Sequence, residues 1–172
     1  HAYFHLHESH ESLANAAAAG GFTRILLQPN EETPLQTVEA VRFYTTMQFE
    51  SGVRFLVSAA ATKDLRGEKM AEVRTLRMYG ASSFSAPAAI SNSFFMAQLI
   101  RYLKADGCTL MHSPMEQELS FLGQIHDGST AANRGLTGIP SVAEDIVIDR
   151  DLNLLRYYGG RVHFSSLSAA TA

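Results

Sequence analysis

Five short apolar segments recur along the chain, and a stretch with helical character separates each from the next. The segments cover residues 22–27, 53–57, 81–85, 108–111 and 161–164. They are apolar nearly throughout, which is typical of strands that are buried on both faces of a parallel sheet. The sequence therefore predicts an α/β fold in which helices cover a parallel sheet.

Helix signals lie between these segments. An Ala-rich run over 8–19 ends at Gly20-Gly21, where a helix C-terminal cap is expected. Thr33, Pro34 and Gln36 have the order of an N-cap, a first helical residue and an N3 residue, so we expect a helix to begin there.

The later part of the chain contains three more expected helices and one long irregular stretch. The helices are predicted over 68–79, over 93–106 and from 141 to 158. Ser141 and Glu144 have the spacing of a capping box. Asp145, Arg150 and Asp151 follow at helical spacing, and with Glu144 they are interpreted as cap and surface ion-pair residues. Residues 113–140 show little periodicity, and we expect a long loop of functional or poorly ordered character.

Composition narrows the classes of protein. With 14 Lys and Arg against 17 Asp and Glu, the net charge of −3 argues against a nucleic-acid partner. A single cysteine, Cys108, cannot form an internal disulfide, and no apolar run is long enough to span a membrane. We therefore expect a cytoplasmic protein in which residues 1–172 form one domain or part of a larger one. The absence of an initiator Met at His1 leaves an upstream portion open.

Periodicity alone leaves two architectures open. A series of five βα units fits an open doubly wound sheet or a segment of a (β/α)₈ barrel, since a closed barrel typically needs about 250 residues.

Four motifs favour the barrel. The first is AAAAGGFT at 16–23, followed by Gln28-Pro29-Asn30 and Thr33-Pro34; the others are GASSFS at 80–85, GIPSVAED at 138–145 with Arg150-Asp151, and GRVHFSSLS at 160–168. In this order and spacing they resemble the signature of the dihydroorotase branch of the amidohydrolase superfamily.

The resemblance implies a fold, a reaction and a cofactor. The fold would be a (β/α)₈ TIM barrel, of which this chain covers about five βα units. The reaction would be hydrolysis of a cyclic amide, interconverting dihydroorotate and carbamoyl aspartate in pyrimidine biosynthesis. The cofactor would be zinc, which activates water and polarises the amide carbonyl. A catalytic zinc site needs about three protein ligands and an open position.

Several ligand positions of the resemblance are altered here. The family's first histidine pair would fall before His1, and Ala86 and Pro87 occupy the place of the bridging carboxylate. His112 matches a ligand histidine, whereas Ser166 replaces another. We therefore expect His112 to be a remnant metal ligand and no catalytic residue to be identifiable. Asn30 matches a residue that contacts the substrate carboxylate.

Three functions stay open at this stage. The first is a dihydroorotase homologue with weak or no activity, which could serve as a structural partner. The second is an active zinc hydrolase with a rearranged site built from His5, His7, His112 and residues outside this chain. The third is a non-catalytic protein that binds a small molecule through Asn30.

The candidate histidines and Asn30 also have plainer interpretations, and His5 and His7 could be solvated residues of a loop or a helix start. His112 could be a buried histidine bonded to backbone, and Asn30 could stabilise a turn. His163 is expected to be packed and His126 to be exposed.

The edges of a five-stranded sheet also call for a partner. Open edges expose unpaired backbone, so we expect residues beyond both ends, a homo-oligomer or a partner chain to cover them.

Overall fold

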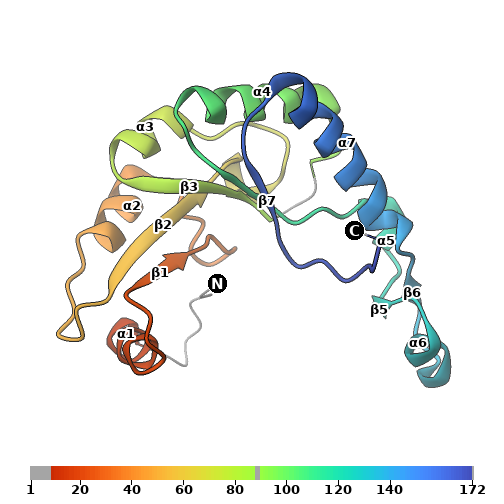
Figure 1. Cartoon of the computed structure of the whole chain (residues 1–172), viewed down its shortest axis with the longest axis horizontal. Helices are drawn as coiled ribbons and strands as arrows, with labels where there is room; N and C mark the ends of the chain where they lie inside the picture. Colours follow the sequence, from red (N-terminus) through yellow and green to blue (C-terminus); the bar gives the residue numbers. More distant parts are fainter. Residues whose placement is uncertain (1–8, 88–89, 172) are drawn as a thin grey trace.

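The computed structural model describes residues 9–87 and 90–171. A curled parallel sheet forms the centre, and helices cover its convex side (Figure 1). The five strands of this sheet are β1 (Arg24–Leu27), β2 (Arg54–Ala60), β3 (Ala81–Ala86), β4 (Leu110–His112) and β7 (Val162–Phe164), in that order across the sheet. All four pairings are parallel, which confirms the five strands and the sheet type predicted from the sequence.

One helix precedes the first strand, and the others lie in the connections between strands. They are α1 (His10–Ala19), α2 (Val38–Thr45), α3 (Val73–Met78), α4 (Ser93–Ala105), α5 (Gln117–Ser120), α6 (Ser129–Arg134) and α7 (Val142–Tyr158), with a short 3₁₀ turn, η1 (Lys63–Leu65). None of the helices in the part of the chain that the structure describes has the length and apolar character needed to cross a membrane.

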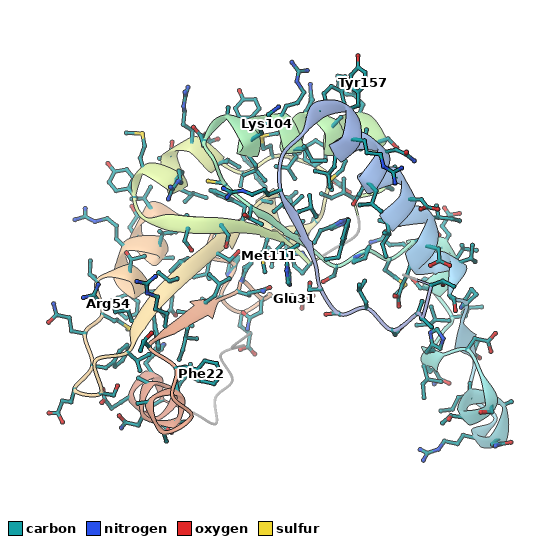
Figure 2. The ribbon with its side chains drawn as sticks, in the orientation of Figure 1. Phe22, Glu31, Arg54, Lys104, Met111 and Tyr157 are labelled. Carbon is teal, nitrogen blue, oxygen red and sulfur yellow. The ribbon has the colours of Figure 1, made fainter. Side chains whose placement is uncertain are left out.

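The core lies between the sheet and the helix layer. Val57, Phe84 and Leu110 contribute from the strands, and these side chains are at most marginally accessible. Leu76, Leu99 and Leu103 meet them from α3 and α4 and are equally buried. Tyr157, in contrast, lies on the outer surface of the helix layer (Figure 2). Burying each large apolar side chain stabilises the fold by about 1.5–3 kcal/mol, so this layer holds the helices on the sheet.

A register shift between β2 and β3 determines which residues of β3 face the core. Val57 pairs with Ala81, but Ser58 pairs with Ser83, so Ser82 is the extra residue of a bulge. The Ser82 hydroxyl donates to the Val57 carbonyl at 3.0 Å. After the bulge, Phe84 and Ala86 belong to the core cluster that faces the helices.

The expected start of the second helix is wrong. Thr37, not Thr33, caps α2, and its hydroxyl accepts from the Ala40 amide at 3.3 Å. Leu35 is buried with a left-handed φ of 47°, and its carbonyl accepts from the Ala60 amide. Because Leu35 is bonded to β2 in this way, the cap of α2 lies four residues later in the chain than predicted.

Two further boundaries differ from the expectation. The predicted helix over 68–79 is shortened to α3, and residues 113–140 form short elements instead of one irregular loop. In that stretch β5 (Ile125–His126) and β6 (Gly138–Ile139) make a two-stranded parallel sheet around α6. β5, α6 and β6 lie below α7 in the view of Figure 1, away from the main sheet.

Candidate functional site

The candidate site lies at the edge where the parallel strands end. Because all five strands run in one direction, their carboxyl ends and the loops that follow share one side of the sheet. A cleft of about 600 Å³ opens among these loops. Charged side chains on its wall come from the loop after β1 and from the region after β2: Glu31, Asp64, Arg66 and Glu68.

Polar side chains at the ends of β1 and β3 pair with each other. Gln28 and Ser85 are both buried, and the Ser85 hydroxyl donates to Gln28 Oε1 at 3.3 Å. Asn30 follows two residues later and is half-buried. Its Oδ1 accepts from the Thr33 amide at 2.6 Å, while its own amide donates to the Thr33 carbonyl at 3.1 Å. Asn30 therefore stabilises a turn; contact with a substrate stays a prediction.

The end of β3 carries no metal-binding side chain. Ala86 is 1% exposed and packs in the core between sheet and helices. Pro87 follows it and is half-buried. A carboxylate at position 86 would lie in an apolar layer, where an unpaired charge is strongly unfavourable.

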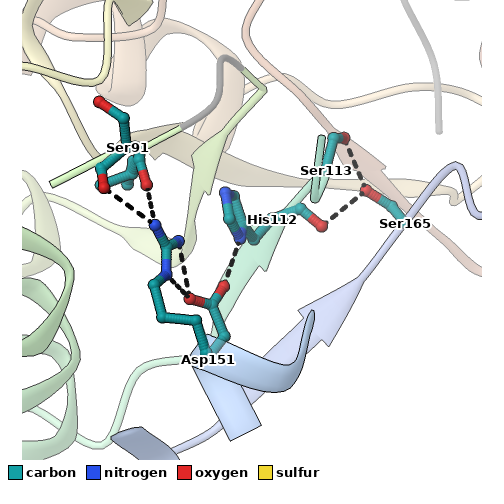
Figure 3. A network of polar contacts seen from close by, with 7 residues as sticks. Ser91, His112, Ser113, Asp151 and Ser165 are labelled. Atoms are coloured by element: carbon teal, nitrogen blue, oxygen red, sulfur yellow. Dashed lines mark hydrogen bonds and ion pairs between the residues drawn. The ribbon is translucent and has the colours of Figure 1, made fainter. Parts of the chain in front are cut away.

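His112, at the end of β4, is fully buried and points toward α7. Its Nδ1 lies 2.8 Å from Asp151 Oδ2, and the Asp151 carboxyl group is also fully buried (Figure 3). Arg150 Nε donates to Asp151 Oδ1 at 2.8 Å, and Arg150 Nη2 lies in ion-pair contact with the same oxygen at 2.8 Å. The interpretation of Asp151 as a surface residue is wrong. Its side chain is buried, and its two carboxylate oxygens contact His112 and Arg150.

Zinc does not fit the described residues at this edge. His112 Nε2 is buried without a hydrogen-bond partner, so one nitrogen could accept a ligand. However, residues 9–87 and 90–171 hold no group of three or more His, Cys, Asp or Glu side chains placed to bind a metal ion. One imidazole is too few for a zinc site. His5 and His7 lie outside the described residues, so their distances to His112 are untested.

Serine hydroxyl groups cluster at the end of β7. The Ser165 amide donates to the His112 carbonyl at 3.0 Å, and the Ser165 and Ser113 hydroxyl oxygens are 3.1 Å apart (Figure 3). Ser166 is exposed and has a left-handed φ of 60°. The residue that the resemblance matches to a ligand histidine therefore has a backbone conformation that L-residues rarely adopt.

A second buried carboxylate anchors the segment after β7. Glu144 is 2% exposed, and its carboxylate accepts from the Ser168 amide at 3.0 Å and the Ala169 amide at 3.1 Å. Burial raises the pKa of Glu144, but the hydrogen bonds from Ser168 and Ala169 and the nearby His126 outweigh it and leave the pKa below its ordinary value. The capping-box prediction is wrong, because the Glu144 side chain turns to this segment and Ser141 makes no side-chain cap bond.

Two other histidine predictions differ from the structure. His126 is half-buried, with Nδ1 at 3.3 Å from the Ser168 hydroxyl and Nε2 at 3.5 Å from the Ser141 hydroxyl. His163 is exposed, although packing was expected. It alternates with Val162 and Phe164, which are half-buried.

Comparison with known proteins decides the family. The chain is 30% identical over 156 residues to a dihydroorotase of Pelotomaculum thermopropionicum, a match that covers 90% of this chain and 36% of that protein. It is 34% identical over 163 residues to a dihydroorotase of Sulfurihydrogenibium, covering 94% and 38% respectively. The chain is a homologue of the dihydroorotases. It spans less than two fifths of the length of these relatives.

Solved structures show the same fold for this dihydroorotase homologue. An L-hydantoinase from Arthrobacter aurescens superimposes with a TM-score of 0.59 at 18% identity, covering 87% of this chain and 35% of the hydantoinase chain. A D-hydantoinase gives a TM-score of 0.58 at 19% identity, covering 94% and 37%. The curled sheet is thus a partial TIM barrel of the amidohydrolase type, as the sequence predicted. No family model matches the chain.

Proposed function

We propose that this dihydroorotase homologue has weak or no dihydroorotate hydrolase activity. The proposal rests on the residues found at the ends of three strands. Ala86 is committed to the core, Ser166 replaces a ligand histidine, and the Nδ1 of His112 is bonded to Asp151. The described residues therefore lack the donor set that would hold a catalytic zinc ion.

The test combines a metal measurement with an assay on the purified protein. A curated dihydroorotase relative, purified and assayed in parallel, is the positive control. Loss of the several kcal/mol that a bound metal supplies lowers the hydrolysis rate by at least about a thousandfold. We expect substoichiometric zinc and a kcat/KM for dihydroorotate at least that far below the control. Stoichiometric zinc together with hydrolysis close to the control rate would refute the proposal.

Retained small-molecule binding is a second candidate function. The charged cleft of about 600 Å³ is lined by Glu31, the residue directly after Asn30 in the chain. A protein that no longer hydrolyses dihydroorotate could still bind it, or a similar cyclic amide acid, at this edge. The resemblance assigns Asn30 to the ligand carboxylate, and its position beside the cleft supports that role.

Asn30→Asp separates the binding role from the turn. The aspartate keeps an acceptor for the Thr33 amide but places a negative charge near a ligand carboxylate. We expect calorimetric titration with dihydroorotate to show at least tenfold weaker binding, with an unchanged melting temperature. Equal affinity of the wild type and Asn30→Asp for dihydroorotate would show that Asn30 does not contact the ligand.

A zinc enzyme with a rearranged site stays a prediction, as does a cytoplasmic location. A role as a structural partner of an active pyrimidine-pathway enzyme also stays a prediction.

A further inference from the structure

Three charged or ionisable side chains meet in one network behind the end of β4, and two of them, His112 and Asp151, are fully buried. Asp151 accepts from Arg150 through Oδ1 and faces His112 through Oδ2. Arg150 also donates through Nη1 to the backbone carbonyls of Ile90 and Ser91, in the loop between β3 and α4 (Figure 3). The network thus joins α7, the end of β4 and that loop.

The charges of the network balance only when His112 is neutral. Arg150 supplies one positive charge and Asp151 one negative charge, in direct contact at 2.8 Å. A protonated His112 would add a second positive charge at a site with no exposed surface. Its Nε2–H would also lack an acceptor, since Nε2 has no hydrogen-bond partner among the described residues. Both penalties favour the neutral imidazole.

The position of the single imidazole proton follows from Asp151. An ionised carboxylate only accepts hydrogen bonds, so the 2.8 Å contact requires the proton on Nδ1. Nε2, on the opposite side of the ring, then carries a lone pair. Arg150 Nε donates to the other carboxylate oxygen and Nη2 makes an ion-pair contact with it, which restrains the carboxylate and with it the orientation of the ring.

We propose that Asp151, clamped by Arg150, is a positioning residue that holds His112 as its neutral Nδ1–H tautomer and keeps Nε2 as a hydrogen-bond acceptor. This role goes beyond the proposed function and does not depend on hydrolysis. It accounts for the fully buried carboxylate of Asp151 on α7, which no zinc ligand set explains.

Nitrogen-15 NMR of the histidine side chains tests the tautomer directly. The ring nitrogen that carries the proton resonates well upfield of the bare nitrogen, so each tautomer has a distinct pattern of long-range correlations. His112→Gln assigns the signals, because only the His112 set disappears. We expect the wild-type protein near pH 7 to show His112 with a protonated Nδ1 and a bare Nε2.

Asp151→Asn tests the positioning role. The amide can donate to Nδ1 as well as accept from it, so we expect a second population of His112 with the proton on Nε2. Asp149→Asn is the matched control, since it removes the same charge from an exposed position on the same helix. The His112 signals should not change in that variant.

Two results would overturn the proposal. One is a wild-type spectrum with a protonated Nε2, whether as the other tautomer or as the imidazolium. The other is a folded Asp151→Asn protein whose His112 pattern equals that of the wild type. If Asp151→Asn does not fold, the wild-type spectrum alone still decides the tautomer.

Discussion

Ser166 has a strained backbone at a position that the resemblance matches to a ligand histidine. Its φ is 60°, which is unfavourable for any residue with a Cβ. Strained conformations persist where the surrounding structure enforces them, and they often occur at functional sites. Here the strain remains although the side chain is an exposed hydroxyl.

Ser166→Gly should stabilise the protein. Glycine adopts positive φ without steric cost, and its extra freedom in the unfolded chain offsets only part of that gain. We expect the free energy of unfolding to rise by about 0.5–1 kcal/mol in urea denaturation. Ser165→Gly is the contrasting control, because it loses the hydroxyl contact with Ser113 and should destabilise. A lower stability of Ser166→Gly would show that the φ of Ser166 is not strained.

Asp151 and Glu144 are the residues that the sequence could least predict. Acidic residues on a helix are almost always exposed unless they are paired, so the surface interpretation is the reasonable one from sequence alone. The partners are distant in the chain, since His112 is 39 residues from Asp151 and Ser168 is 24 residues from Glu144. Nothing in the local pattern identifies such partners.

At the scale of elements, strands were easier to predict than helix boundaries. A strand buried on both faces needs a continuous apolar run, and such a run is visible in the sequence without any tertiary information. The start of α2 depends instead on Leu35 bonding to Ala60 across the fold. The short elements between 113 and 140 have too few residues for a detectable period.

The contact of α7 with the segment after β7 should be sensitive to acid. Because the pKa of Glu144 is lowered in the folded state, its stabilisation is complete above its ordinary value of about 4.5 and is lost as the pH falls through the lowered pKa. Glu144→Gln should cost about 1.5–3 kcal/mol at pH 7, the usual value of hydrogen bonds to a charged group. The variant should also lose less stability between pH 5 and pH 3.

Urea denaturation at several pH values measures both effects. Asp149→Asn on the same helix is the control for charge alone, because Asp149 is exposed. Parallel pH profiles for wild type and Glu144→Gln would mean that the Glu144 carboxylate does not anchor Ser168 and Ala169.

For the whole molecule, the open sheet is the dominant feature. β1 and β7 are the outer strands of the main sheet, and each pairs on one side only within the described residues. The sequence predicted the barrel type because several dispersed motifs agree in order, but it could not show how this partial barrel covers its edges. A homo-oligomer or partner chain at these edges stays a prediction.

A charge on the β7 edge should weaken self-association. Edge strands avoid pairing with other chains by carrying charged side chains, lysine in particular. We expect wild-type protein to form dimers or larger species at rising concentration in light-scattering measurements. His163→Lys, at an exposed position of β7, should shift the distribution toward monomer, whereas Thr75→Lys on α3 should not. Identical distributions for all three proteins would exclude this edge as the contact.

The unit of β5, α6 and β6 bears on how the molecule unfolds. Of its helix and strand residues only Ala131 is buried, so it shares little apolar surface with the sheet. Segments with few buried contacts open at lower free energy than the core to which they are attached. Unfolding therefore need not be cooperative across the entire chain. A melting curve that follows the five-stranded sheet would report the unfolding of that sheet after the unit of β5, α6 and β6 had already unfolded.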